Sequence, residues 1–271
     1  MSGTLYLVAT PIGNLEDITL RALRILREVD LVACEDTRQT RKLLDHYGIH
    51  KPTISFHEHN ERARELDLLL KLRDGAQIAL VSDAGTPLVS DPGYHLVAEA
   101  IAQGIRVEPI PGPSAVLAGL AASGLPTDAF HFGGFLPARS SPRRKALAAL
   151  RDEPATLIFF EAPHRIRETL ADIDEVLGAR PVVLAREVTK IHEQFLRGTA
   201  AELRLADIPL KGEFTLLIGK AVAPPPPDET PLQEAIAARM SAGLSRMDAI
   251  KAVARERGLS KREVYRLALE S

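Results

Sequence analysis

Short apolar segments rich in Val, Ile and Leu recur in the first part of the chain, and each is followed by a segment whose apolar residues repeat every ~3.6 positions. The apolar segments occupy residues 5–10, 30–36, 78–83 and 106–111. Because they are apolar along their whole length and do not alternate, they are typical of strands buried on both faces of a parallel sheet. Regular succession of strand and helix also indicates βαβ units. We therefore predict an α/β domain whose parallel sheet is covered by helices.

A second strand–helix series follows a polar, basic stretch at 138–145. We predict a helix over 162–177, with Pro163 in its first turn. Strands are predicted in three further apolar segments, 155–160, 181–187 and 214–220. A chain of 271 residues is long enough for two domains. We place them at residues 1–124 and 125–222, with the join near 124–142.

The C-terminal part is predicted to be a separate helical tail. The prolines at 224–227 are expected to form a stiff, non-helical spacer, and the tail comprises residues 228–271. Two pairs match the capping box at the start of a helix, Ser245 with Asp248 and Ser260 with Glu263. Because Gly258 separates the two predicted helices, the pattern indicates a helix-turn-helix.

This tail is locally basic. From residue 239 to 266 it holds eight Lys or Arg and three Asp or Glu, a local charge of +5. Such a charge favours binding of nucleic-acid phosphates. The alternatives are that the basic residues solvate one face of a small bundle, or that the bundle mediates dimerisation.

Composition limits the classes of protein. The 34 Lys and Arg nearly balance the 36 Asp and Glu, for a formal charge of −2, so a nucleic-acid surface must be a local patch. The single cysteine, Cys34, excludes an internal disulfide and a cysteine-based zinc site and fits a reducing cytoplasm. The first apolar segment has no basic region before it, and no segment approaches the ~20 apolar residues of a membrane span. We expect a cytoplasmic protein outside the membrane.

Ligands of an open parallel sheet bind beyond the carboxyl ends of its strands, and three strand-end loops are unusual here. In loop 10–19, Pro11 and Gly13 favour a tight turn, although the Gly-x-Gly-x-x-Gly pattern is absent. Loop 82–93 combines glycines with two carboxylates that can accept hydrogen bonds from a polar ligand. Loop 111–124 places Ser114 at the start of an Ala-rich helix, whose N-terminus suits a carboxylate or phosphate. Close helix–sheet packing explains its small residues equally well.

Metal and hydrolase chemistry have little support. His57 and His59 would share one side of a strand, but they lack any recognised zinc spacing, and we expect no metal. The sequence contains no Gly-x-Ser-x-Gly, His-Glu-x-x-His or Walker A pattern, which leaves hydrolase and P-loop functions without a motif.

Several longer strings occur together in order: TPIGNLEDIT, ACEDTR, SFHEHNE, SDAGTPLVSDPG, PGPSA and REVTKIHE. Over residues 4–220 the chain thereby resembles the tetrapyrrole methylase superfamily. Within it, the strings resemble the bacterial ribosomal small-subunit RNA (cytidine-2′-O)-methyltransferases. The resemblance implies two α/β domains with S-adenosylmethionine in the cleft between them, no metal, and commonly a homodimer. PIGN replaces the glycine-rich start of tetrapyrrole enzymes, which favours a cytidine ribose in the decoding region of small-subunit RNA as the target.

The resemblance also implies a set of cofactor contacts. In the first domain these are Thr10 or Pro11 together with residues of the two later loops. The second domain supplies residues at strand ends that face the cleft. The full set is Thr10, Pro11, Asp83, Gly85, Thr86, Val89, Ser114, Ala115, Phe160, Glu187 and Thr215.

Methyl transfer to a hydroxyl needs orientation of the reacting atoms and a group that accepts the proton. Glu187 is the first candidate for this general base and Glu161 the second, followed by Asp36 and His57, although each carboxylate is also explained by a structural ion pair. Lys190 could lower the pKa of the reacting hydroxyl. Candidates for phosphate contacts are Arg38, Arg165, the basic 139–145 loop with Arg139, Arg143, Arg144 and Lys145, and Lys261 and Arg262 in the tail.

Two alternative functions are compatible with the sequence. A tetrapyrrole methyltransferase would share the cofactor site and differ in its acceptor. A ligand-responsive regulator without catalysis would use the tail to read DNA, and the helix-turn-helix pattern is its only support.

Overall fold

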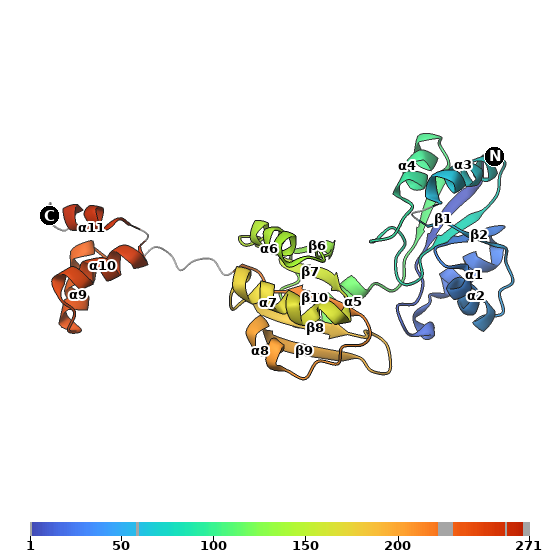
Figure 1. Cartoon of the computed structure of the whole chain (residues 1–271). Coiled ribbons are helices and arrows are strands. Elements are labelled where there is room, and N and C mark those ends of the chain that lie inside the picture. The colour runs from blue at the N-terminus through green and yellow to red at the C-terminus, as the bar shows by residue number, and fades with distance from the viewer. Residues whose placement is uncertain (1, 58–59, 222–229, 258, 268–271) are drawn as a thin grey trace. The chain divides into compact units, whose positions relative to one another are not determined.

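The computed structural model describes residues 2–57, 60–221, 230–257 and 259–267 (Figure 1). The chain divides into two compact units, residues 1–221 and 222–271. The first unit contains two five-stranded sheets, and the second is helical. The mixed α/β class is therefore confirmed, whereas the boundary between domains 1–124 and 125–222 stays a prediction.

The first sheet is entirely parallel. Its strands are β1 (Thr4–Val8), β2 (Leu31–Cys34), β3 (Thr53–Ser55), β4 (Ile78–Val81) and β5 (Arg106–Ile110), in the spatial order β3-β2-β4-β1-β5. Three of these strands lie within the predicted apolar segments, and β1 begins one residue before its segment. β3 was not predicted because it has only three residues, all of them partly exposed at the edge of the sheet.

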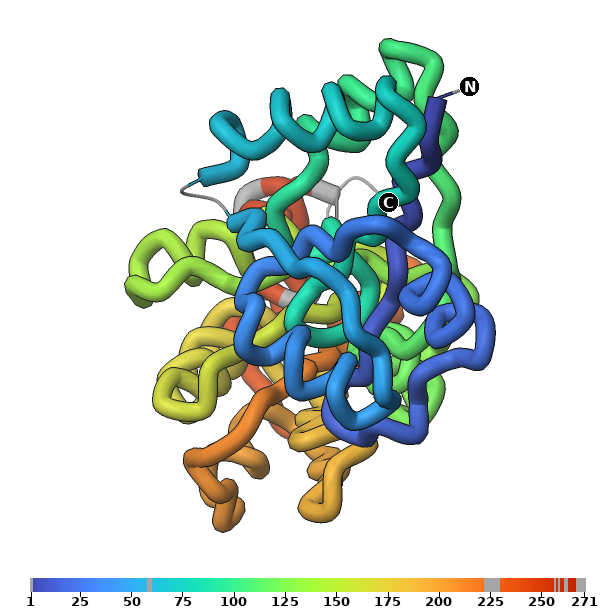
Figure 2. Tube along the Cα trace, turned by 90° about the vertical axis from the view of Figure 1, so that its right-hand side faces the viewer, coloured from blue at the N-terminus to red at the C-terminus, as the bar shows by residue number. Residues whose placement is uncertain are grey.

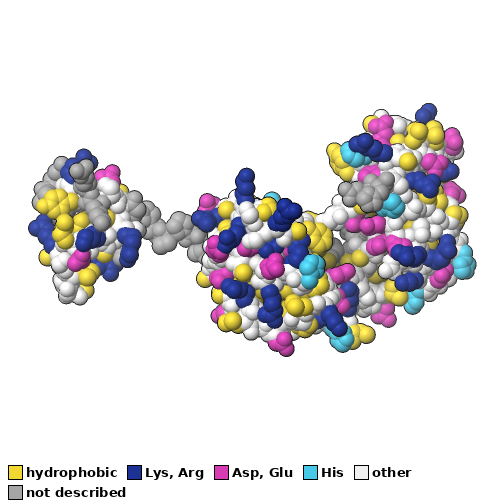
Figure 3. All heavy atoms as spheres, in the orientation of Figure 1, with side chains coloured by type: hydrophobic (Ala, Val, Ile, Leu, Met, Phe, Trp, Pro, Cys, Tyr) yellow, Lys and Arg dark blue, Asp and Glu magenta, His cyan; other side chains and the backbone are white. Residues whose placement is uncertain are grey.

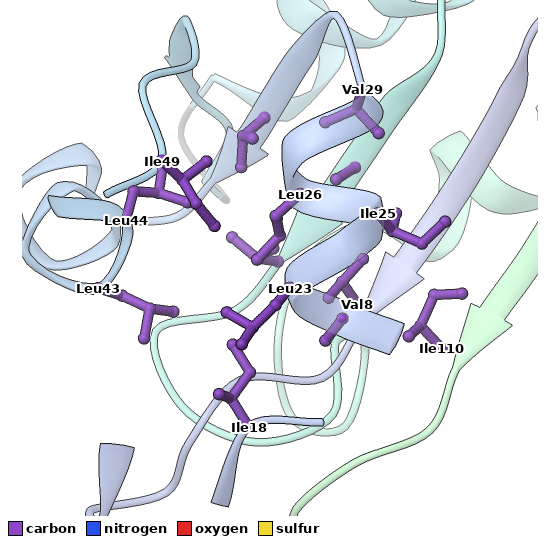
Figure 4. Close-up of a cluster of buried hydrophobic side chains, with 14 of the residues drawn as sticks. Val8, Ile18, Leu23, Ile25, Leu26, Val29, Leu43, Leu44, Ile49 and Ile110 are labelled. Atoms are coloured by element: carbon purple, nitrogen blue, oxygen red, sulfur yellow. The ribbon is translucent and has the colours of Figure 1, made fainter. Parts of the chain in front are cut away.

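Helices cover both faces of this sheet. The pair α1 (Leu20–Glu28) and α2 (Thr37–His46) lies on one face, and α3 (Glu61–Arg73) with α4 (Tyr94–Ala102) on the other (Figure 2). A short 3₁₀ turn, η1 (Leu15–Asp17), precedes α1. Leucine and isoleucine side chains of α1 and α2 pack on the strands in one buried cluster (Figure 4). Burial of such side chains on both faces is the physical reason why the inner strands β2 and β4 are apolar throughout.

The second sheet is mixed. Its strands are β6 (Phe130–Phe135), β7 (Thr156–Glu161), β8 (Pro181–Arg186), β9 (Gln194–Thr199) and β10 (Phe214–Ile218), in the order β6-β7-β10-β8-β9. Only β6 and β7 pair in parallel. The edge strands β6 and β9 were not predicted, and β6 lies where the sequence indicated a join.

Four α-helices and a short 3₁₀ turn are associated with this sheet: α5 (Ala115–Ser123), α6 (Ser140–Ala149), η2 (Pro163–Arg165), α7 (Ile166–Leu177) and α8 (Ala200–Leu205). α5 packs directly on the strands, because a Cβ atom at Gly119 would lie 3.2 Å from Cγ2 of Thr215. The small residues of this helix therefore serve close helix–sheet packing, the second of the two explanations that the sequence left open.

The basic stretch at 139–145 is not a loop. From Ser140 onward it forms the first turns of α6, and Arg143 is fully buried. Its Nε donates to Oδ2 of Asp172 on α7 at 2.6 Å. The prediction that Arg143 contacts RNA is therefore wrong, because a buried, paired guanidinium cannot reach a phosphate. Arg144 is partly exposed and pairs with Asp172 and Glu175, whereas Arg139 and Lys145 are exposed.

The second unit is a small helical cluster of α9 (Leu232–Ser241), α10 (Arg246–Glu256) and α11 (Lys261–Leu267) around a core that includes Ile236, Ile250 and Val264. Ser260 and Glu263 form the expected reciprocal capping pair, since each backbone N–H donates to the other's side chain. The prolines at 224–227 and the side chains of Lys261 and Arg262 lie outside the described residues. No described helix is long and apolar enough to cross a membrane.

The buried Arg143–Asp172 pair predicts an effect on stability. Asp172→Ala leaves the guanidinium buried without its partner, so we expect a loss of about 3 kcal/mol in the free energy of unfolding. Asp174→Ala is the matched control, because Asp174 pairs with Arg204 at 3.5 Å with both side chains partly exposed, and it should cost less than ~1 kcal/mol. Urea unfolding followed by circular dichroism measures both. Equal losses would show that burial adds nothing to the first pair.

Candidate active site

A cavity of about 420 Å³ opens among the strand-end loops of the first unit. The first sheet contributes loop residues after β1, β4 and β5, and the second contributes residues around the ends of β6, β7, β8 and β10. This is the edge at which an open α/β sheet binds ligands. Eight of the predicted cofactor residues line the cavity: Asp83, Gly85, Thr86, Val89, Ser114, Ala115, Phe160 and Thr215.

Thr10 supports the cavity and does not line it. It is buried, and its hydroxyl donates to the carbonyl of Ser82 at 3.1 Å. Its backbone exchanges two hydrogen bonds with Gly85, at 2.9 and 3.0 Å. The ends of β1 and β4 are thus tied together, and the two loops hold one geometry. Pro11 also lies outside the lining.

Loop 82–93 has an unusual backbone. Leu88 and Ser90 have φ of 72° and 69°, and Gly85 and Gly93 also have positive φ. A non-glycine residue in this region costs about 1–3 kcal/mol unless surrounding contacts hold it there. The end of the loop is held by the side chain of Glu61 on α3, which accepts the N–H of Gly93 at 3.0 Å. The loop is therefore held in a conformation that its own residues do not favour.

The start of α5 presents a polar end to the cavity. Ser114 caps the helix by accepting the N–H of Leu117, and Ser114, Ala115 and Val116 line the cavity. The N-terminus of a helix carries partial positive charge, which favours an anionic group nearby. Aromatic rings form another part of the wall, where Phe160 and Phe135 lie with ring centroids 5.6 Å apart. An apolar wall with a few polar groups is typical of a small-molecule site.

Glu161 lines the cavity, but its carboxylate is fully engaged. It is buried and accepts hydrogen bonds from Thr169 at 2.6 Å and from the N–H of Ala162 at 2.8 Å, and it pairs with Arg165 at 3.0 Å. Arg165 also donates to the carbonyl of Leu136. These contacts favour structural roles for both residues over proton transfer and phosphate binding.

Asp91 is a partly buried carboxylate in the lining. Burial, and then the negative charges of Glu35 and Asp83, raise the pKa of Asp91 to about 6, although a hydrogen bond with Ser82 lowers it in part. Burial and the charge of Asp83 likewise raise the pKa of Glu35 at the end of β2, while His57 acts in the opposite direction. Asp83 and Asp91 therefore line the same part of the cavity, and Glu35, outside the lining, acts on Asp91 through its charge.

Glu187 and Lys190 lie just outside the lining. Oε1 of Glu187 accepts Nζ of Lys190 at 2.8 Å and the backbone N–H of Glu213 at 3.0 Å. Burial alone would raise the pKa of Glu187, but these hydrogen bonds outweigh it and lower the pKa. The stem of Lys190 covers Gly13, where a Cβ would lie 2.3 Å from its Cγ. This pair braces the wall of the cavity at 212–215.

The other sequence candidates do not line the cavity. Arg38 is exposed, and its contact with Asp36 lowers the pKa of that carboxyl to about 2, which makes Asp36 a weak base. His57 is partly buried, and Glu58 and His59 lie outside the described residues. Among the residues that the structure describes, no group of three His, Cys, Asp or Glu side chains could hold a metal ion.

Residues 4–204 match the family model described as Tetrapyrrole (Corrin/Porphyrin) Methylases. This chain belongs to that family. It is 48% identical to the ribosomal RNA small subunit methyltransferase I of Halalkalibacterium halodurans, over 98% of this chain and 94% of the relative. It is 47% identical to the protein of the same name from Escherichia coli O157:H7, over 99% and 95%.

Solved structures of other proteins have a similar fold. A diphthine synthase superposes with a TM-score of 0.64 at 18% identity, covering 80% of this chain and 90% of that one. A cobalt precorrin-4 methyltransferase superposes with a TM-score of 0.61 at 20% identity, covering 82% and 96%. At this level of identity the likeness shows the fold alone.

Sequence reasoning missed some of the residues that line the cavity. The cavity is also lined by Phe135 on β6, by Ala162 and Pro163 after β7, and by residues 212–214 at the start of β10. The structure shows why residue 212 is glycine: its φ is 88°, and a Cβ there would lie 2.5 Å from the carboxyl carbon of Glu187. In the sequence it is one glycine among 18.

Gly212→Ala tests the brace formed by Glu187. The new methyl group must displace the carboxylate from Lys190 and from the N–H of Glu213, in addition to straining the backbone. We expect a loss of about 3 kcal/mol in the free energy of unfolding. Gly124→Ala is the control for strain alone, since its φ is 81° with no atom within 4 Å of the added Cβ, and should cost about 1 kcal/mol. If chemical denaturation gives the same loss for both variants, Glu187 does not brace this wall.

Proposed function

We propose that this protein transfers a methyl group from S-adenosylmethionine to the 2′-hydroxyl of a cytidine in the decoding region of small-subunit ribosomal RNA. The observation that carries the proposal is the near-full-length identity, 47–48%, to proteins named as small-subunit ribosomal RNA methyltransferases. Those names also favour RNA over a tetrapyrrole as the acceptor. The regulator alternative has no counterpart among these relatives. Such a substrate implies a cytoplasmic protein, and the homodimer stays a prediction.

The residues that line the cavity are chemically suited to S-adenosylmethionine. An apolar wall with Phe160 and Val89 suits adenosine, and the start of α5 at Ser114 suits the carboxylate of the methionine part. The bound cofactor would supply a methyl group already activated by its sulfonium. Residues of this chain then orient the acceptor, exclude water and receive a proton. We assign cofactor binding to Asp83, Gly85, Thr86, Val89, Ser114, Ala115, Phe160 and Thr215.

Exposed basic residues supply surfaces for phosphate. Arg38, Arg139 and Lys145 are exposed on the first unit. Lys and Arg also outnumber acidic groups on the helical unit, as the face in Figure 3 illustrates. We propose that both surfaces contact RNA, which would make binding to small subunits weaken steeply with salt. A salt dependence unchanged by neutralising the tail would assign the tail to dimerisation.

Methyl transfer to small subunits tests the function. Subunits from a strain lacking this protein should accept label from S-adenosyl[methyl-³H]methionine, and the label should map to one cytidine after nuclease digestion. The adjacent phosphodiester should resist alkali, because a 2′-O-methyl group removes the nucleophile of alkaline cleavage. Label on a base, or on many nucleotides, would refute the 2′-O assignment, and absence of any label would refute RNA as the substrate.

Gly85→Val tests the cofactor assignment by calorimetry. Valine places two methyl groups where the backbone of loop 82–93 meets the cavity, at a φ of 83° that favours glycine. We expect affinity for S-adenosylmethionine to fall at least ~10-fold, equivalent to about 1.4 kcal/mol. Gly48→Val is the control, because Gly48 has φ of 60° with open space around it, away from the lining. Unchanged affinity in Gly85→Val would remove this loop from the cofactor site.

A further inference from the structure

We infer that Asp91 is the general base that takes the proton from the acceptor hydroxyl. The inference rests on the proposed function, since it concerns the hydroxyl acceptor. It assigns to loop 82–93 a catalytic role beside cofactor binding, and it differs from the sequence-based choice of Glu187.

The contacts of the lining carboxylates lead to this assignment. Four carboxylates line the cavity: Asp83, Asp91, Glu161 and Glu213. Oδ1 of Asp83 accepts the backbone N–H of Asp36 at 3.0 Å. Glu161 is buried with Arg165 and Thr169, and Glu213 pairs with Lys190 at 3.0 Å. Among the described residues that line the cavity, Asp91 is thus the carboxylate that neither a cation nor a backbone N–H holds.

The surroundings of Asp91 suit proton transfer at neutral pH. It lies at the end of loop 82–93, between Ser90 with φ of 69° and Pro92, so the backbone on both sides is restricted. Glu35 at the end of β2 and Asp83 after β4 are the negative charges that act on it. Glu61 on α3 accepts the N–H of Gly93. His57, which precedes α3, lowers the pKa of Glu35 through its charge. β6 presents the neutral Gly134 and Phe135 near this loop.

These groups make Asp91 more basic than an ordinary carboxylate. With a pKa of about 6 it is mostly ionised at pH 7 and still binds a proton readily, which is the compromise that general-base catalysis needs. Glu187 is less suited, because its pKa is lowered and its carboxylate already accepts two hydrogen bonds.

The proposed reaction is a displacement at the methyl carbon. The 2′-oxygen forms a bond to the methyl carbon as the carbon–sulfur bond breaks, and the electron pair of that bond stays on sulfur. The hydroxyl proton passes to the carboxylate of Asp91, which becomes neutral. Asp91 then releases the proton to solvent. This step requires no metal, oxidant or further reactant.

The same environment predicts a signature that does not depend on activity. Because burial and neighbouring acids raise the pKa of Asp91 from 3.8 to about 6, the folded protein binds this proton more tightly than the unfolded chain. The contribution of Asp91 to stability is therefore lost as pH rises through this range. Asp91→Asn removes this loss, so its melting temperature should exceed that of the wild type at pH 7.5, with the difference shrinking toward pH 4.

The kinetic experiment compares Asp91→Asn, Asp91→Glu and Glu187→Gln with the wild-type full-length chain on small subunits. We expect Asp91→Asn to lower kcat roughly 10²- to 10⁴-fold while calorimetry shows cofactor affinity within a few-fold of wild type. Asp91→Glu should recover part of the rate because it retains a carboxylate. Glu187→Gln should instead alter stability and cofactor affinity more than kcat. Asp74→Asn, an exposed carboxylate at the end of α3, is the control for loss of a negative charge.

The pH profile provides the second kinetic test. The rate of the wild type should rise with pH to a plateau above about 6, following ionisation of Asp91. Glu35→Gln removes a neighbouring negative charge, so it should lower the pKa of Asp91 and move this rise to lower pH.

The outcomes separate this inference from the proposed function. If the wild type methylates small subunits and Asp91→Asn keeps near-full turnover, the function stands and the inference is refuted. If the wild type transfers nothing to RNA, the function itself fails, whatever the melting temperatures show. Loss of turnover in Asp91→Asn together with higher stability at pH 7.5 would support the base, whereas loss of both turnover and stability would refute it in favour of a structural role.

Discussion

Helix α5 packs on the second sheet through small residues, and the cavity depends on this contact. Val116 and Leu120 are buried with Ile158, Val183 and Leu217, in a cluster that also includes Ile12 from the loop after β1. Each such side chain contributes ~2 kcal/mol when fully buried. The cluster therefore joins elements that follow the first sheet to the strands of the second. A larger residue at Gly119 would meet Thr215, which lines the cavity, and would move the start of α5 relative to that wall.

Charge in and around the cavity falls into two kinds. At one side, Glu187, Lys190 and Glu213 satisfy one another and hold backbone in place. At the other, Glu35, Asp83 and Asp91 repel one another, and the pKa values of Glu35 and Asp91 rise. Ion pairs stabilise a wall, whereas unpaired acids cost stability and are more often found at sites of chemistry. We therefore assign a structural role to Glu187 and Lys190 and a catalytic role to Asp91.

The sequence predicts those elements whose burial repeats along the chain. Strands β1, β2 and β4 lie inside the first sheet and are recognisable because both of their faces are covered, whereas β5 lies at its edge and fully buries only Ile110. The edge strand β6 is not, since its sequence FHFGGF contains two glycines and most of its residues are exposed. Edge strand β9, QFLRGT, mixes polar and apolar residues for the same reason. An edge strand buries fewer side chains, so its pattern resembles that of a loop.

Site residues that act through their chemistry can be predicted from the sequence, whereas those that act through their shape cannot. Loop 82–93 is recognisable from its carboxylates and glycines. Phe135 and Gly212 carry no chemical signature in the sequence, since they act through shape. Arg143 illustrates the opposite error, because its charge suggests a phosphate contact until the fold brings Asp172 to its side, 29 residues later. Long-range pairing of this kind is invisible to local patterns.

Two backbone irregularities meet at the edge of the cavity. β6 shifts register between Phe132 and Phe135, and Gly134 within this shift has φ of 64°. A Cβ at Gly134 would lie 3.5 Å from Oγ of Ser90, which has a positive φ of its own. A bulge displaces an edge strand locally, and here it brings Phe135 into the cavity wall beside the loop. Strained residues persist where neighbouring structure holds them. The bulge therefore contributes to the restraint on Ser90, and through the chain to the position of Asp91 that follows it.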